Sequence, residues 1–440
     1  MKKKYGLVLV SILLLVSIAF SLSGCGQVKI PSTEGSTGGR QETNTDFEGN
    51  ISAVNLMAGF VSTLTGDKRE IDENFIRSQM ELSLKLFKAS ANENSGKNVL
   101  VSPLSIQLAL AMNANGAKGT TKSEMEALLG NGAALEELNE YLNSYVQGLP
   151  SEEKYKLEIA NSIWFRSFGF TPNEEFLQAN KNYYDSDVYS APFDKSTVND
   201  INSWVTDKTD GMINKAIEDI PSNAIMYLIN AIMFDAEWAN KYNEYSILNG
   251  KFTSESGEEE DAEMMHSSEY LYVELENAKG FKKQYKDGKY SFVALLPNED
   301  VDITSFVNTL EAEALLGALA NQSYENIYAI MPKFSYEFEI NLNRALSSLG
   351  MSTAFDSENA DFSGIGEASG NIYITGVTHK TYIAVDEAGT RAGAVTIVED
   401  GAESEPEIPI TIELNRPFLF MIVDNATNLP IFIGTLTSLK

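Results

Sequence analysis

Apolar residues recur at helical spacing in two stretches early in the globular part of the chain. Between Asp72 and Ser90 the apolar side chains return every three or four positions, which predicts an amphipathic helix with Asp72 as its N-cap. A second helix is predicted in SPLSIQLALAMNANGA, because Pro103 suits a first helical turn and Ser102 can cap it. The stretch INSWVTDKTDGMINKAI, residues 201–217, predicts a further helix that is broken at its DG pair.

Several other runs have the composition of strands. The runs IANSIWF, YLINAIMF, SFVALLPN, IYAIMPKF, TYIAV and FLFMIVDN are rich in β-branched and aromatic residues, and turn residues follow them. Some are apolar at nearly every position, which predicts strands that are buried on both faces. Because helices and strands do not alternate regularly, we expect a mixed α+β fold with large, mainly antiparallel or mixed sheets.

The segment VDEAGTRAGAVTIVEDGAESEPEIPI near the C-terminus changes character along its length. If it is extended, one face carries only small or uncharged side chains: Thr390, Ala392, Ala394, Thr396 and Val398. The other face begins with Arg391, and an acidic stretch that ends at Pro406 follows. The small face could enter a core between existing strands without overpacking. The alternative is a surface hairpin with a solvated acidic tip.

The N-terminus predicts export. MKKKYGLVLVSILLLVSIAFSLSGC has a basic start, a short apolar stretch and small residues at its end, so we expect residues 1–24 to be a signal peptide. The LSGC run resembles a bacterial lipobox, which implies cleavage before Cys25 and lipidation of that residue; the alternative is an ordinary secretory signal. Residues 25–50 are polar and rich in Gly, Ser and Thr, which is typical of a flexible tether. The body, residues 51–440, is expected to be a single domain on the extracellular face of a bacterial membrane, or secreted if the anchor is not used.

Composition narrows the function further. The 440 residues are 43% hydrophobic, which suits a globular body, and Cys25 is the only cysteine, so no internal disulfide is expected. Removal of the signal peptide takes away three lysines and leaves 30 basic against 62 acidic residues, a net charge of 30 − 62 = −32. So negative a protein repels phosphate backbones, and we expect no nucleic-acid partner.

Catalytic signatures are missing from the sequence. Its two histidines, His266 and His379, lie in separate segments, and the motifs G-x-S-x-G, H-E-x-x-H and C-x-x-C do not occur. We therefore expect no enzyme, metal or cofactor. His379, between two apparent strands, is interpreted as a hydrogen-bonded core histidine rather than a base. A hydrolase with a carboxylate pair is the enzymatic alternative, although acidic residues are too abundant to single out a pair.

From about residue 50 to its end the chain resembles the serpin family. The resemblance is carried, in order, by NVLVSPLSIQLALAMNANGAKGTT, LINAIMFDAEW, MMH at 264–266, MPKF, LSSLGMSTAF with ADFSGI, THKTYIAVDEAGTRAGA and NRPFLF. It implies the serpin fold: three β-sheets, about nine helices and an exposed reactive-centre loop at about residues 387–412.

The resemblance also implies an activity, the irreversible inhibition of serine proteases. A target attacks a bond in the loop and forms an acyl-enzyme, and the severed loop then inserts into the large sheet, which distorts the protease. Inhibitory members have small residues in the loop hinge, and the corresponding hinge positions here are Glu387, Gly389, Thr390, Ala392, Gly393 and Ala394. The alternative is a serpin fold that serves as a non-inhibitory binding module on the cell surface.

Two further groups carry over by resemblance. Ser102, Ser105, Asn230 and His379 match the hydrogen-bonded cluster that the family calls the shutter, beneath the opening of the large sheet. Trp238, Lys333 and Glu387 match the breach, where insertion begins, the last two as an ion pair.

The reactive bond is placed by counting from the hinge glutamate. The family's spacing puts it at Glu403-Ser404, with Ala402-Glu403 as the alternative; Glu405-Pro406 is disfavoured because a bond before proline is a poor protease substrate. The expected partner is a serine protease that accepts acidic or small residues: glutamyl-specific, elastase-like or subtilisin-like. We expect a monomer that is anchored to a membrane through lipidated Cys25.

Overall fold

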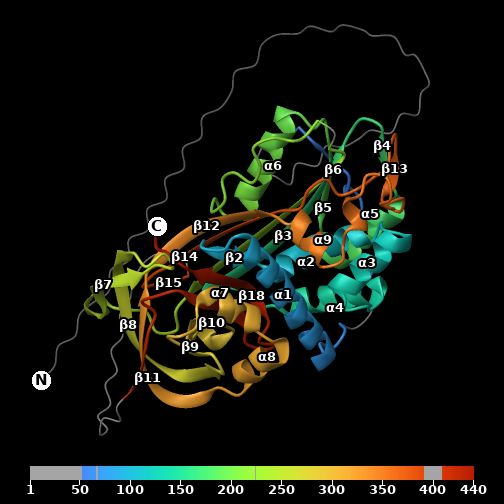
Figure 1. Ribbon diagram of the computed structural model, residues 1–440. Coiled ribbons are helices and arrows are strands. Elements are labelled where there is room, and N and C mark those ends of the chain that lie inside the picture. The colour runs from blue at the N-terminus through green and yellow to red at the C-terminus, as the bar shows by residue number, and fades with distance from the viewer. Residues whose placement is uncertain (1–51, 66–67, 223, 391–408) are drawn as a thin grey trace, which may run out of the picture. The chain divides into compact units, whose positions relative to one another are not determined.

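The computed structural model describes residues 52–65, 68–222, 224–390 and 409–440, and all of these fall in one compact unit that extends over Thr43–Lys440 (Figure 1). Within the described residues there are nine α-helices and three β-sheets, which is the mixed α+β class predicted. No helix among these residues is both long and apolar enough to cross a bilayer.

The α-helices are α1 (Glu73–Glu93), α2 (Pro103–Ala114), α3 (Gly119–Leu129), α4 (Leu135–Gly148), α5 (Glu174–Tyr184), α6 (Lys195–Lys208), α7 (Ile303–Thr309), α8 (Ala312–Ala320) and α9 (Asn343–Ser348). Short 3-10 turns occur at Glu244–Ser246, Lys286–Gly288 and Thr353–Phe355.

The strands are β1 (Val54–Asn55), β2 (Val99–Val101), β3 (Tyr155–Arg166), β4 (Phe170–Pro172), β5 (Asp187–Ala191), β6 (Met226–Glu237), β7 (Ile247–Thr253), β8 (Glu259–Leu275), β9 (Ala278–Gln284), β10 (Tyr290–Pro297), β11 (Ser323–Pro332), β12 (Phe334–Asn341), β13 (Gly366–Ala368), β14 (Thr378–Val385), β15 (Gly389–Thr390), β16 (Ile410–Glu413), β17 (Phe418–Asp424) and β18 (Pro430–Leu436). The seven-stranded sheet has the order β1-β5-β3-β6-β15-β14-β12. The nine-stranded sheet has the order β16-β11-β8-β9-β10-β17-β18-β2, with β7 also paired to β8, and β13 pairs with β4.

Helix boundaries follow the local signals. Asp72 caps α1 by accepting a hydrogen bond from the backbone N–H of Phe75, and Ser102 caps α2, in which Pro103 occupies the first turn. The break predicted at Asp210-Gly211 is confirmed, whereas residues 212–217 after it are not helical. The helix begins earlier, at Lys195, and ends at Lys208, because the backbone is left-handed at Asp210 and at the glycine after it.

All six runs predicted as strands overlap strands of the structure. They fall in β3, β6, β10, β11 with β12, β14 and β17, and every residue of β10 and β17 is buried, as their apolar sequences predict. Pairing is mainly antiparallel, with β3 parallel to β5 and β11 parallel to β16.

The seven-stranded sheet separates two hydrophobic cores. On one face α6 packs through Trp204 against Trp164 of β3 and Ile229 of β6. The other face contributes Leu228 and Phe234 to the main core, together with side chains of α1 and α2. In Figure 1, α6 accordingly lies on one side of this sheet, and α1 and α2 on the other.

Candidate functional site: the opening between β6 and β14

A two-residue strand lies between two long ones at one end of the seven-stranded sheet. Thr390 of β15 pairs with Val385 of β14 and with Ala236 of β6, antiparallel to both. Farther along the sheet, Leu228 and Val377 form an isolated parallel bridge between the same two segments. The described start of the predicted loop is therefore already part of the sheet.

A tight turn leads into β15. The Asp386 carboxylate accepts hydrogen bonds from the backbone N–H groups of Ala388 (2.8 Å) and Gly389 (3.1 Å), while its own N–H donates to the Gly389 carbonyl at 3.0 Å. A Cβ atom on Gly389 would lie 2.0 Å from the carbonyl oxygen of Ala236. Only glycine therefore allows β15 to approach β6 this closely.

Thr390 points into the main core rather than into solvent. It is 3% exposed, and its hydroxyl is hydrogen-bonded to the hydroxyl of Tyr285. The Tyr285 ring stacks on Trp238 with centroids 4.5 Å apart. Burial raises the pKa of Tyr285, so the phenol stays protonated.

The three residues predicted as the breach converge on this turn. Trp238 donates its backbone N–H to the Ala388 carbonyl (2.9 Å) and its indole N–H to the Asp386 carbonyl (2.8 Å). Nζ of Lys333 lies 2.8 Å from a carboxylate oxygen of Glu387. The hydrogen bond from Lys333 lowers the pKa of Glu387, so the pair is ionised near neutral pH.

The four residues predicted as the shutter are joined through the first turn of α2. The backbone N–H of Ser102 donates to Nε2 of His379 on β14 at 3.0 Å, and the Ser105 hydroxyl donates to Oδ1 of Asn230 on β6. The same helix turn thus binds both strands that border the opening. His379 is 4% exposed, and burial lowers its pKa to about 3, so the ring is neutral and accepts the bond.

Sequence reasoning missed three polar residues of these groups. Nδ2 of Asn230 donates to Oδ1 of Asn161 on β3 at 2.6 Å, and Tyr285 and Asp386 hold β15 as described above. The alternation of β3 marks Asn161 as an inward-facing polar position in a strand, which is a usable signal. No local pattern distinguishes Tyr285.

Other predicted positions lie apart from the site or outside the described residues. His266 is on β8, where Nδ1 lies 2.8 Å from the Tyr328 hydroxyl, in the other large sheet. Cys25 and the segment 391–408, which contains the hinge positions Ala392, Gly393 and Ala394 and the alternative bonds at 402–404, lie outside the described residues. Within the predicted loop limits of about 387–412, Gly389–Thr390 and Ile410–Glu413 are strands of the two large sheets.

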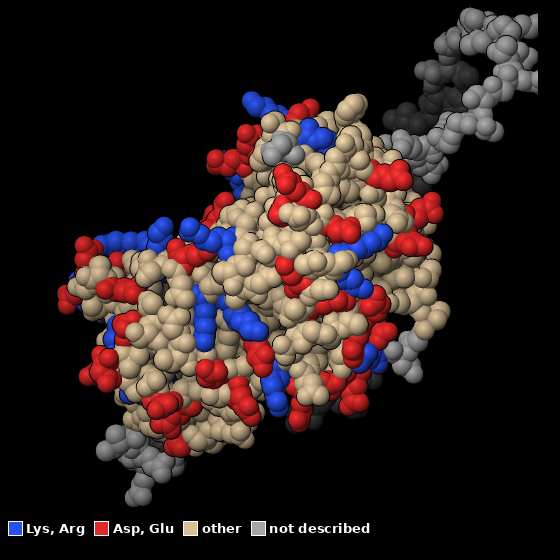
Figure 2. Space-filling view, turned by 45° about the vertical axis from the view of Figure 1, so that its right-hand side comes forward, with Lys and Arg blue, Asp and Glu red and all other residues tan. Residues whose placement is uncertain are grey.

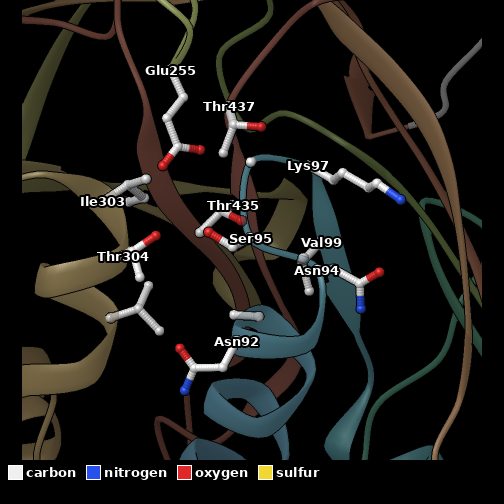
Figure 3. A pocket seen from close by; sticks show the side chains of 13 residues that line it. Asn92, Asn94, Ser95, Lys97, Val99, Glu255, Ile303, Thr304, Thr435 and Thr437 are labelled. Carbon is white, nitrogen blue, oxygen red and sulfur yellow. The ribbon is translucent and has the colours of Figure 1, made fainter.

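A pocket elsewhere has no role in this site. It lies where α1, α7 and β18 meet, lined by Asn92, Ile303 and Thr435 among others (Figure 3), and its volume is about 20 Å³. That volume suffices for one water molecule and not for an organic ligand. Among the described residues, no three His, Cys, Asp or Glu side chains are grouped so that they could hold a metal ion.

The surface charge is spread widely. On the face drawn in Figure 2, acidic side chains occur over nearly the whole outline, with Lys and Arg among them. The negative net charge is therefore not confined to one acidic segment.

Comparison with known proteins gives a consistent result. The model of the family "Serpin (serine protease inhibitor)" matches residues 77–439. The leukocyte elastase inhibitor of Xenopus tropicalis is 31% identical over 388 residues, covering 83% of this chain and 100% of that protein. The crystal structure of the thermophilic serpin tengpin in its native state has 47% identity and a TM-score of 0.85, covering 88% of this chain and all of that one. Its latent state has 46% identity and a TM-score of 0.77, covering 85% and 100%. The chain belongs to the serpins, which are serine protease inhibitors and not enzymes.

Proposed function

We propose that this serpin is an irreversible, suicide-substrate inhibitor. A serine protease attacks a bond in the loop after β15, and the freed arm then inserts between β6 and β14 while still esterified to the enzyme. The observation that carries this proposal is β15 itself, since a segment that already lies between two strands needs only to lengthen.

The register of the sheet supports an insertion of defined length. Ala236 and Leu228 are 236 − 228 = 8 residues apart on β6, and Val385 and Val377 are 385 − 377 = 8 apart on the β14 side. A strand that continues from Thr390 in the same register reaches Val398 after eight residues, between Leu228 and Val377. Insertion would thus replace the direct bridge between Leu228 and Val377 by a ladder in which the inserted strand pairs with both segments.

The faces of the inserted strand would match the two cores. Because side chains alternate, Ala392, Ala394, Thr396 and Val398 would share the inward face of Thr390. On β6 their partners would be Phe234, Ile232, Asn230 and Leu228, three of which belong to the main core. Small residues fit there without displacing existing side chains. Arg391 would lie on the other face, beside Asp235.

The same register would bring Thr396 to the shutter. Its partners would be Asn230 on β6 and His379 on β14, the two residues that α2 binds through Ser105 and Ser102. When β6 and β14 move apart, α2 cannot keep its hydrogen bonds to both Asn230 and His379. The hydroxyl of Thr396 can replace the bond that is lost.

The test is incubation of the full chain with subtilisin, pancreatic elastase and a glutamyl endopeptidase. We expect at least one of them to form an adduct that survives boiling in SDS, and the cleaved protein to melt at a markedly higher temperature than the uncut one. A chain that is only nicked, with an unchanged melting temperature, would exclude the mechanism. Sequencing of the released C-terminal peptide identifies the bond, for which Glu403-Ser404 is the first candidate and Ala402-Glu403 the second.

Export and anchoring form a separate part of the proposal. The signal-like residues 1–24 and the LSGC run support lipidation of Cys25, with the inhibitor held on the extracellular face of a bacterial membrane as a monomer. Expression in a bacterium fed radiolabelled palmitate tests this. Label should enter the wild-type chain and not the Cys25→Ser variant, and the variant should appear in the medium.

A further inference from the structure

A buried ion pair lies behind the residues that hold the start of the loop. Nζ of Lys283 on β9 is 2.6 Å from Oε1 of Glu269 on β8, and the two side chains are only 2% and 12% exposed. The ladder between β8 and β9 ends at Leu271 and Lys282, so the pair bridges the two strands just beyond their last paired residues.

Aromatic rings surround the ammonium group. Nζ of Lys283 lies 4.4 Å from the ring centroid of Tyr242 and 5.4 Å from that of Trp238. The hydroxyl of Ser267 lies 2.7 Å from the Glu269 carboxylate and 3.3 Å from the Tyr242 hydroxyl. Burial alone would lower the pKa of Lys283, but the neighbouring Tyr242 and Glu269 raise this pKa above its ordinary value. The charge on Lys283 therefore persists at neutral pH.

Both of these aromatic residues bind the backbone of the turn before β15. The N–H of Tyr242 donates to the Glu387 carbonyl at 3.0 Å, and the N–H of Trp238 donates to the Ala388 carbonyl at 2.9 Å. The ring of Trp238 also stacks on Tyr285, the partner of Thr390. One buried charge thus contacts the two residues whose backbone holds the turn.

Stability alone does not explain this pair. Desolvation of two charges offsets most of their attraction, and apolar residues of similar volume often give an equally stable protein. What a buried pair adds is a single preferred geometry, because only one arrangement satisfies both charges.

We propose that the pair Lys283–Glu269 is a positioning device for loop insertion. The pair fixes Trp238 and Tyr242, which hold the turn before β15. It thereby raises the barrier to insertion beyond the two residues of β15 before the loop is cleaved. This inference rests on the proposed function, since it concerns the timing of the same insertion. Neither residue contacts the protease or the bond that is cut.

The test compares uncut full-length chains that are held at a fixed temperature below melting. Samples are assayed over time for a rise in melting temperature together with loss of loop cleavage by subtilisin, the signs of insertion without cleavage. In the double variant Lys283→Met/Glu269→Leu we expect this conversion to be faster by roughly tenfold or more, the scale of one desolvated cation–π contact. Lys282→Met is the matched control, because Lys282 is a buried neighbour on β9 whose Nζ contacts Asn428 instead, and its rate should equal that of the wild type.

Conversion of the double variant at the wild-type rate, or more slowly, would overturn the inference, as would equal acceleration in Lys282→Met. If the double variant does not fold, Glu269→Gln replaces it, because the amide keeps the shape while removing one charge, and the same acceleration is expected. Failure of the wild type to trap any protease would count against the proposed function alone. The conversion is measured without a trapped protease, so the ion pair is still tested.

Discussion

The hydroxyl of Thr390 is hydrogen-bonded to the hydroxyl of Tyr285, and this contact marks the point where the loop enters the sheet. Thr390 is 3% exposed here, before any bond of the loop has been cut. Thr390 therefore shows which face of the loop would point inward on insertion. In an extended strand the side chains that follow Thr390 alternate between this face and the opposite one.

Replacement of Thr390 by arginine should separate cleavage from trapping. The loop would remain a substrate, but a charge would have to enter the main core beside Tyr285 when the loop inserts, at a cost of several kcal/mol. That cost corresponds to a shift of more than about 100-fold in the partition between trapping and release. The ratio of SDS-stable adduct to cleaved inhibitor measures this partition. Thr390→Ser keeps the hydroxyl and should trap normally. Normal trapping by the arginine variant would contradict the inward assignment.

Gly389→Ala should also reduce trapping, through the backbone rather than the side-chain face. The added Cβ would lie 2.0 Å from the Ala236 carbonyl oxygen, so β15 would have to move away from β6. Overpacking of this kind costs about 1–3 kcal/mol, and we expect roughly tenfold more cleaved product per adduct. Gly317→Ala in α8, where a Cβ meets no atom within 4 Å, is the control and should behave as the wild type. Equal behaviour of the two variants would argue against a close β15–β6 contact during trapping.

Acid should weaken the shutter through His379. Its pKa is about 3 in the folded protein against 6.5 unfolded, so the unfolded state binds more protons between these values. The contribution of the neutral ring is complete above pH 6.5 and is lost as the pH falls towards 3, by up to about 1.4 kcal/mol per pH unit. Urea unfolding midpoints at pH 7 and pH 5 should therefore differ more for the wild type than for His379→Gln. If the difference in urea midpoint between the wild type and the variant is the same at pH 7 and pH 5, His379 is not the titrating group.

The residue before the cut should determine the target. If Glu403 precedes the reactive bond, Glu403→Arg should convert the chain into a trap for trypsin, whose pocket selects basic residues, and should abolish adducts with a glutamyl endopeptidase. Ala402→Arg serves as the comparison, because it should produce the better trypsin inhibitor only if Ala402-Glu403 is the bond. Peptide sequencing after each reaction distinguishes the two outcomes.

Much of this architecture could be predicted from local sequence. The caps at Asp72 and Ser102, the apolar strands β10 and β17 and the turn glycine at 389 carry signals within a few residues of themselves. The break at Asp210-Gly211 was predicted from its turn residues and is confirmed. Residues 212–217 were expected to continue as helix and do not, because Asn202 accepts hydrogen bonds from the backbone N–H groups of Ala216 and Ile217 and holds that segment in a nonhelical path. Tertiary contact overrode periodicity there.

By itself the sequence determined the family resemblance, the small inward face of the loop, and the residues of the breach and the shutter as candidates. Only the tertiary structure decided that β15 already lies between β6 and β14, that α2 binds both of these strands, and that Lys283 meets Glu269 behind Trp238. The physical reason is that caps and alternation depend on neighbouring residues, whereas these contacts join residues that strand order and register alone bring together.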